Sequence, residues 1–178
     1  SDIWFSNFCN KKNRVVLAYN WRLRSLANYI QQLEMESLGK PFNPHSIFHK
    51  TGQTIFGGFG STAQHSYFQL LHQGTSQCSA DIIYSPSDQT SLSNAQARGQ
   101  SNLLSSEQNQ SANSLERTNG NVPVNLFTLP KLSLKELGFL LATWEHRVYV
   151  TASLLQINPF DQFGVAAGKK AAQKFHKK

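Results

Sequence analysis

The stretch QTIFGGFGSTAQHSYFQLLHQGTSQCSADIIY, residues 53–84, contains the pattern that decides the fold. Gln53–Gly57 and Ala80–Tyr84 are short apolar runs bounded by polar residues, which predicts two buried strands. Between them, glycines at 57, 58 and 60 predict a tight turn, and a capped helix is expected from about residue 62 to Gln73. A strand, a helix and a second strand in this order predict parallel pairing through a right-handed crossover.

The residues on the N-terminal side of this stretch repeat the same alternation. Residues 2–9 resemble the end of an apolar helix, and Arg14–Tyr19 is a further apolar run that predicts a buried strand. Asn20 can cap a helix from Trp21 to about Ser37, in which apolar residues recur at helical spacing. Three strands separated by two helices therefore extend the predicted parallel sheet.

The C-terminal side is less regular. Residues 85–121 are rich in Ser, Asn and Gln and contain no aromatic residue, so we expect an insertion or loop that contributes little to the core, with at most a short helix around Leu103–Leu115. Residues 122–129 are again apolar. Helices are expected from Leu132 to about Gln156 and from Phe160 to Phe175, the last one carrying a basic tail at 169–178.

The elements together predict one α/β domain over residues 1–178, with three layers and a central parallel sheet flanked by helices. Ligands of such sheets bind at the carboxyl ends of the strands, where the glycine turn at 57–60 is expected. Side chains predicted to be buried are Val15, Leu17, Leu26, Ile30, Ile55, Phe68, Leu71, Ile82 and Ile83.

The charge of the chain is strongly positive, with a formal net charge of +7. One basic cluster lies near the N-terminus and another in the C-terminal tail, and the candidates for contact with an anionic partner are Lys11, Lys12, Arg14, Lys170, Lys174, Lys177 and Lys178. Such clusters favour RNA or an acidic protein surface, ahead of a membrane, and a phosphate is also compatible. The alternative interpretation is a solvated face and a frayed tail.

Several classes of protein are disfavoured by the composition. No run reaches the ~18 apolar residues that a membrane span needs. Cys9 and Cys78 form no disulfide framework and no metal-ligand spacing, so two reduced thiols, no metal and no secretion are expected, in a cytoplasmic or organellar compartment. The chain starts at Ser1, which indicates a processed product or part of a longer gene product.

Four segments together resemble glucose-6-phosphate isomerase. Residues 31–40 (QQLEMESLGK) resemble a family segment ending MES-N/L-GK, and residues 60–75 resemble the helix GTNGQHxFxQLxHQGT. Residues 143–146 (TWEH) resemble the family's YEH segment. Residues 158–169 (NPFDQFGVAAGK) are similar to the C-terminal signature FDQxGVExGK. All four occur in family order and span most of the chain.

The resemblance implies the C-terminal sugar-isomerase (SIS) domain of such an enzyme, with the other half absent from this chain. Family members interconvert glucose 6-phosphate and fructose 6-phosphate without a cofactor, and a homodimer is implied as well. A carboxylate moves a proton between C1 and C2 through an enediol. By resemblance, Gln162 and Lys169 are candidates for contact with a sugar phosphate, whereas Gln64, His65 and His72 fit structural roles.

The chain departs from the family at positions that the reaction uses. The family base is the Glu of GEPG, and the aligned segment here is Gly57-Gly58-Phe59-Gly60, so Gly58 occupies the base position. The family's ring-opening histidine would align near Gln89-Thr90. No histidine occurs between His72 and His146, and Ala166 replaces the Glu of GVExGK.

Three hypotheses about function follow. The leading one is an isomerase-like domain without isomerase activity, retained as a structural or binding module in a larger assembly. The second is a fragment of an active isomerase, in which Glu36 or another carboxylate replaces the missing base. The third is a sugar-phosphate sensor that keeps Gln162 and Lys169 for binding only.

Overall fold

The core of the molecule is a four-stranded sheet in which every pairing is parallel. The computed structural model describes residues 2–87, 91–107 and 113–176. The strands lie in the order β2-β1-β3-β4. Their bounds are Asn13–Ala18 for β1, Thr54–Phe59 for β2, Cys78–Tyr84 for β3 and Val124–Thr128 for β4. The predicted α/β class and parallel sheet are confirmed.

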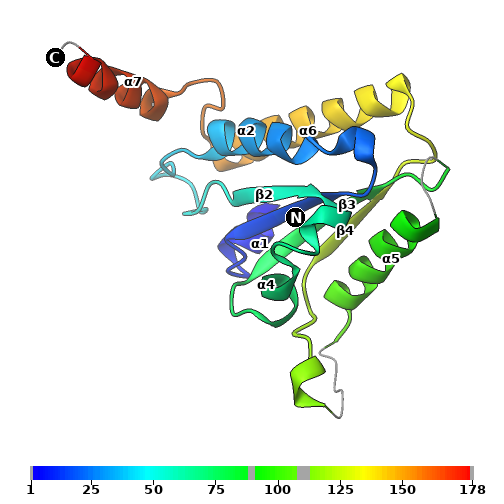
Figure 1. The fold of residues 1–178 in the computed structure, drawn as a ribbon. Helices are drawn as coiled ribbons and strands as arrows, with labels where there is room; N and C mark the ends of the chain where they lie inside the picture. The colour runs from blue at the N-terminus through cyan, green and yellow to red at the C-terminus, as the bar shows by residue number, and fades with distance from the viewer. Residues whose placement is uncertain (1, 88–90, 108–112, 177–178) are drawn as a thin grey trace.

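Helices cover both faces of the sheet, which gives the three predicted layers. Figure 1 shows α2 and α6 side by side over one face, with α4 and α5 over the other. The helices of the described residues are α1 Asp2–Asn7, α2 Leu26–Leu38, α3 Gly60–Ala63, α4 Phe68–Gln73, α5 Ser91–Ser105, α6 Leu134–Leu155 and α7 Phe163–His176, with short 3₁₀ turns η1 Trp21–Leu23 and η2 Ser114–Glu116. None of them is both long and apolar enough to cross a membrane.

Alternation along the strands divides the core into two clusters. In β1, Val15 and Leu17 face α3, α4 and α5, whereas Val16 and Ala18 face α2 and α6. Successive strand residues point to opposite faces, so each strand serves both layers. All nine side chains predicted to be buried are buried, which confirms that part of the sequence analysis.

The segment at 85–121 differs from its prediction. A helix occupies Ser91–Ser105 rather than the region around Leu103–Leu115, and it does contribute to the core. Ala97 and Leu104, seven positions apart on one helix face, are 0% and 1% exposed. Two well-placed apolar residues are enough to dock α5 because its polar side chains find partners on the neighbouring helices.

Two smaller boundaries also differ. The helix expected from Trp21 begins instead as η1, where the Asn20 side chain accepts a hydrogen bond from the Arg22 N–H at 3.0 Å, and α2 starts at Leu26. The predicted turn at residues 57–60 is the end of strand β2, and Gly60 is the first residue of α3. Gly57 and Gly60 therefore serve close packing rather than a reversal of the chain.

The last helix stands apart from the rest of the domain. In Figure 1, α7 projects away from the sheet beyond the end of α2 and α6. Every residue from Phe163 to His176 is exposed. Lys177 and Lys178 of the basic tail lie outside the described residues.

Candidate functional site

The carboxyl end of β2 is built around two glycines that no other residue could replace without movement. A Cβ atom at Gly57 would lie 1.9 Å from the carbonyl oxygen of Val16 on the neighbouring strand. A Cβ atom at Gly60 would lie 2.4 Å from Cζ of Tyr19. Because real Cβ atoms do not approach so closely, both positions are fixed as glycine by packing.

Gly58 is different, although it lies between them. Its Cβ direction is open, and the nearest atom is the hydroxyl oxygen of Tyr67 at 3.9 Å. Gly58 pairs with Leu17 in the sheet and therefore lies on the face covered by α3, α4 and α5. A side chain fits at this position, so packing does not require a glycine where the resemblance implies a carboxylate.

Two tyrosine hydroxyls are buried beside these glycines. The oxygens of Tyr19 and Tyr67 are inaccessible to solvent and have no hydrogen-bond partner among the described residues. Burial raises the pKa of Tyr67 to about 12. The pKa of Tyr19 is raised further, mainly by burial and in addition by the charge of Tyr67. Both phenols are therefore protonated at neutral pH and can act as hydrogen-bond donors, not as bases.

The segment predicted as one helix from about residue 62 to Gln73 forms α3 and α4 with a turn between them, and its polar residues make structural contacts with α5. Gln96 accepts a hydrogen bond from Ser61 at 2.8 Å and donates one to Gln64 at 3.2 Å. His72 Nε2 lies 2.8 Å from the side-chain oxygen of Gln100. These bonds agree with the structural role expected for Gln64 and His72, but their partners on α5 were missed because that segment was predicted to be loop. His65 is exposed, and its role stays a prediction.

The structure does not bring Gln162 and Lys169 to Gly58. The side chain of Lys40, at the end of α2, binds the carboxylate of Asp161 at 3.2 Å and holds the start of the C-terminal segment there. Gln162 follows and lines a hollow of about 280 Å³ together with Glu36. Lys169 lies further along α7, which projects away from the sheet (Figure 1).

Glu36 is not placed to supply the base that the resemblance implies at position 58, which corrects that alternative. Its neighbour Met35 accepts a hydrogen bond from the N–H of Ile55, near the start of β2, at 3.4 Å. Glu36 therefore belongs to the α2 side of the sheet, near the amino ends of the strands. Gly58 faces the other layer, near the carboxyl end of β2.

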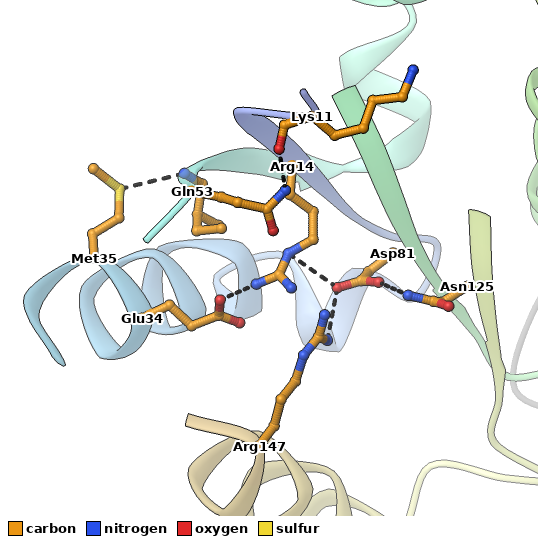
Figure 2. Close-up of polar contacts among 9 residues, drawn as sticks. Lys11, Arg14, Glu34, Met35, Gln53, Asp81, Asn125 and Arg147 are labelled. Atoms are coloured by element: carbon orange, nitrogen blue, oxygen red, sulfur yellow. Dashed lines mark hydrogen bonds and ion pairs between the residues drawn. The ribbon is translucent and has the colours of Figure 1, made fainter. Parts of the chain in front are cut away.

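A network of buried charges crosses the α2 side of the sheet, as Figure 2 shows. Asp81, 0% exposed on β3, accepts from Arg147 at 3.0 Å and from Asn125 at 2.7 Å, and it lies 3.4 Å from Nε of Arg14. Arg14 also binds Glu34 on α2. Charges removed from water need such partners. The sequence signal was present, since Arg14 and Asp81 each stand within an apolar strand.

The buried network removes one residue from the candidates for contact with an anionic partner. Arg14 is 1% exposed and already paired with carboxylates, so it cannot contact an external anion, which corrects its inclusion. Lys12, Lys170 and Lys174 are exposed, and Lys11 is partly exposed. The position aligned with the family histidine, Gln89-Thr90, lies outside the described residues.

The remaining site chemistry is limited. Within residues 2–87, 91–107 and 113–176, no group of three His, Cys, Asp or Glu side chains could hold a metal ion. Cys9 and Cys78 are free, and burial raises the pKa of the Cys78 thiol. The described site therefore offers hydrogen-bond donors and an open position at Gly58.

The matching family model and the curated relatives named here are both described as the same isomerase. The family model described as phosphoglucose isomerase matches residues 1–178. A glucose-6-phosphate isomerase of Legionella pneumophila (strain Lens) is 38% identical over 171 residues, covering 95% of this chain and 34% of that protein. One of Psychrobacter cryohalolentis is 38% identical over 198 residues, covering 98% and 36%. The chain thus spans about a third of the length of these curated relatives.

Solved structures agree with the sequence matches. The crystal structure of a glucose-6-phosphate isomerase from Chlamydia trachomatis superimposes with a TM-score of 0.83 and 30% identity, over 98% of this chain and 36% of that one. A hypothetical protein of Thermus thermophilus, TT0462, superimposes with a TM-score of 0.72 over 93% of this chain at 22% identity, and so shares the fold.

Proposed function

The chain belongs to the phosphoglucose isomerase family, and on that premise we propose that it is a glucose-6-phosphate isomerase-like domain without isomerase activity of its own. It serves as a structural or binding module in a larger assembly. The observation that carries this proposal is the open, side-chain-free position at Gly58, between two glycines whose close packing is kept.

The chemistry of the reaction gives this observation its weight. Isomerisation of an aldose to a ketose needs a base on the substrate carbon, and removing a positioned base typically costs about 10²–10⁴ in rate. The nearest group, the phenol of Tyr67, has a pKa of about 12. At pH 7 roughly one molecule in 10⁵ would carry the phenolate. Tyr67 is therefore no substitute for a carboxylate.

The proposal is tested by a coupled assay of glucose 6-phosphate and fructose 6-phosphate interconversion with the purified chain. We expect no turnover, and we expect Gly58→Glu alone not to restore it, because Gln162 and Lys169 do not lie at this position. Turnover on the order of one per second that Lys169→Ala abolishes would overturn the proposal.

A fragment of an active isomerase is the second candidate. The identity of 38% over nearly the whole chain favours it, together with the close packing at Gly57 and Gly60. In that case the base comes from a segment outside residues 1–178. The same assay on the complete gene product distinguishes the first candidate from the second. If the second is right, the complete gene product turns over substrate and the isolated chain does not.

Sugar-phosphate binding without chemistry is the third candidate, supported by exposed Gln162 and Lys169 in matching signature positions. Calorimetric titration with fructose 6-phosphate should then show binding that Gln162→Ala and Lys169→Ala weaken. Binding that neither substitution changes would exclude these two residues from the site.

A further inference from the structure

A second hollow, of about 430 Å³, lies near the amino end of β2, whereas Gly58 lies near the carboxyl end of the same strand. Lys12, which precedes β1, and Thr54, the first residue of β2, place it at the amino ends of the strands. Its other functional groups come from Lys40, Lys50, Phe42 and His49. We call the group formed by Lys12, Lys40, Phe42, His49 and Lys50 the lysine pocket. Its volume is in the range typical of small-ligand sites.

The walls of the lysine pocket are held by hydrogen bonds from separate elements. The side-chain oxygen of Asn7 on α1 accepts from the backbone N–H groups of His49 and Lys50, at 3.1 and 2.9 Å. The amide nitrogen of Asn7 donates to the carbonyl of Lys50 at 2.9 Å. On the other wall, Thr51 donates to the carbonyl of Lys40 at 2.7 Å. The pocket is therefore a fixed feature of the fold.

The charge of the lysine pocket is unbalanced. Lys40 is neutralised by Asp161, which it contacts at 3.2 Å. Lys12 and Lys50 are exposed and form no ion pair within the described part of the chain. The backbone N–H of Thr54 donates to the carbonyl of Lys12 at 2.9 Å, which fixes the chain beside the pocket. Two ammonium groups without a protein counterion favour a phosphate.

An aromatic surface adjoins these charges. The rings of Phe42 and His49 are 5.3 Å apart between centroids and inclined by 34°. Phe42 is about half exposed, so part of its side chain is accessible to a ligand. Lysines beside exposed aromatic rings are the combination with which proteins bind single nucleotides of RNA, the lysines contacting phosphate and the rings stacking on the base.

We propose that the lysine pocket binds a nucleoside phosphate, with the phosphate at Lys12 and Lys50 and the base against Phe42 and His49. The nucleotide is either free or part of a single-stranded RNA. This site is separate from the position at Gly58, which lies near the other end of β2, and from the isomerase reaction. A binding experiment that finds no nucleotide at the lysine pocket therefore does not contradict the proposed function. Detection of isomerase activity likewise does not contradict the lysine pocket.

The test is fluorescence anisotropy of the purified chain with a labelled oligoadenylate of eight nucleotides, with AMP and ribose 5-phosphate as competitors. Lys12→Ala and Lys50→Ala should each weaken binding and lower the log–log salt slope by about 0.7. Phe42→Ala should weaken binding by roughly tenfold or more. The matched control is Lys135→Ala, an exposed lysine at the start of α6, which should change neither quantity.

The competitors distinguish a free nucleotide from a nucleotide within single-stranded RNA. Full displacement by AMP identifies a free nucleotide as sufficient, whereas displacement by AMP that is weak but still stronger than by ribose 5-phosphate, with tight oligonucleotide binding, identifies RNA. AMP that competes no better than ribose 5-phosphate would overturn the role of the base. Equal losses in Lys135→Ala and Lys12→Ala, or binding of polyglutamate that matches the oligonucleotide and ignores Phe42→Ala, would overturn the site.

Discussion

The ring of Tyr19 packs on Gly60 so closely that a Cβ atom at position 60 would lie 2.4 Å from Cζ of the tyrosine. Tyr19 follows the last residue of β1, and Gly60 begins α3 directly after β2. The contact therefore joins the carboxyl ends of two neighbouring strands. It also fixes the position of the residues between Gly57 and Gly60.

The three glycines should respond differently to alanine. Gly60→Ala and Gly57→Ala should each lower the free energy of unfolding by about 1–3 kcal/mol or more, because the new methyl group overlaps neighbouring atoms. Gly58→Ala should be neutral or stabilise by up to about 1 kcal/mol, since the position is open and the unfolded chain loses freedom. Urea denaturation of the three variants measures this, and a Gly58→Ala variant as unstable as Gly60→Ala would contradict the geometry.

Stability should fall with pH through the alkaline range. The pKa of Tyr67 is raised from 10.0 to about 12, so its contribution is fully present below about pH 10 and is lost as the pH rises towards 12. Because Tyr67 is only partly buried, solvent screens much of the effect, and the loss should be about 1 kcal/mol or less. Urea denaturation at pH 9 and pH 11.5 should show a smaller loss for Tyr67→Phe. Identical losses in both proteins would rule out Tyr67 as the source.

The buried carboxylate of Asp81 should be essential for stability. Asp81→Ala leaves Arg14 and Arg147 without their shared acceptor, and breaking a buried pair in this way costs about 3–5 kcal/mol. The control is Asp161→Ala, which removes the more exposed pair with Lys40 and should cost less than about 1 kcal/mol. Denaturant midpoints of the two variants compare these effects. Similar midpoints would mean that the network contributes little.

Helix α5 should contribute measurably to the core despite its polar sequence. Leu104→Ala should destabilise the domain by about 2–5 kcal/mol, because Leu104 is 1% exposed in the core cluster beneath α5. Leu92→Ala, on the same helix but 66% exposed, should stay within about 0.5 kcal/mol of the unmodified chain. Thermal or urea unfolding checks both, and a tolerant Leu104→Ala variant would mean that α5 is not docked in solution.

The sequence by itself determined three of the four strands of the central sheet, whereas β4 was recognised only as an apolar stretch. Apolar runs such as Arg14–Tyr19 and Ala80–Tyr84 predict buried strands because only a sheet covered on both faces hides so many consecutive side chains. The intervening helices then required parallel pairing. The motifs around residues 60–75 and 158–169 also carried the family resemblance, which the similar proteins bear out.

Only the tertiary structure decided where the polar and charged residues belong. Arg14 counts as surface charge in the sequence but is buried, because Glu34 and Asp81 arrive from α2 and β3 to neutralise it. Helix α5 has too few apolar residues for the sequence to predict it. It docks because Gln96 and Gln100 form hydrogen bonds with other helices. Local composition sets how much a segment can bury, whereas pairing of polar groups depends on distant segments that only the folded chain brings together.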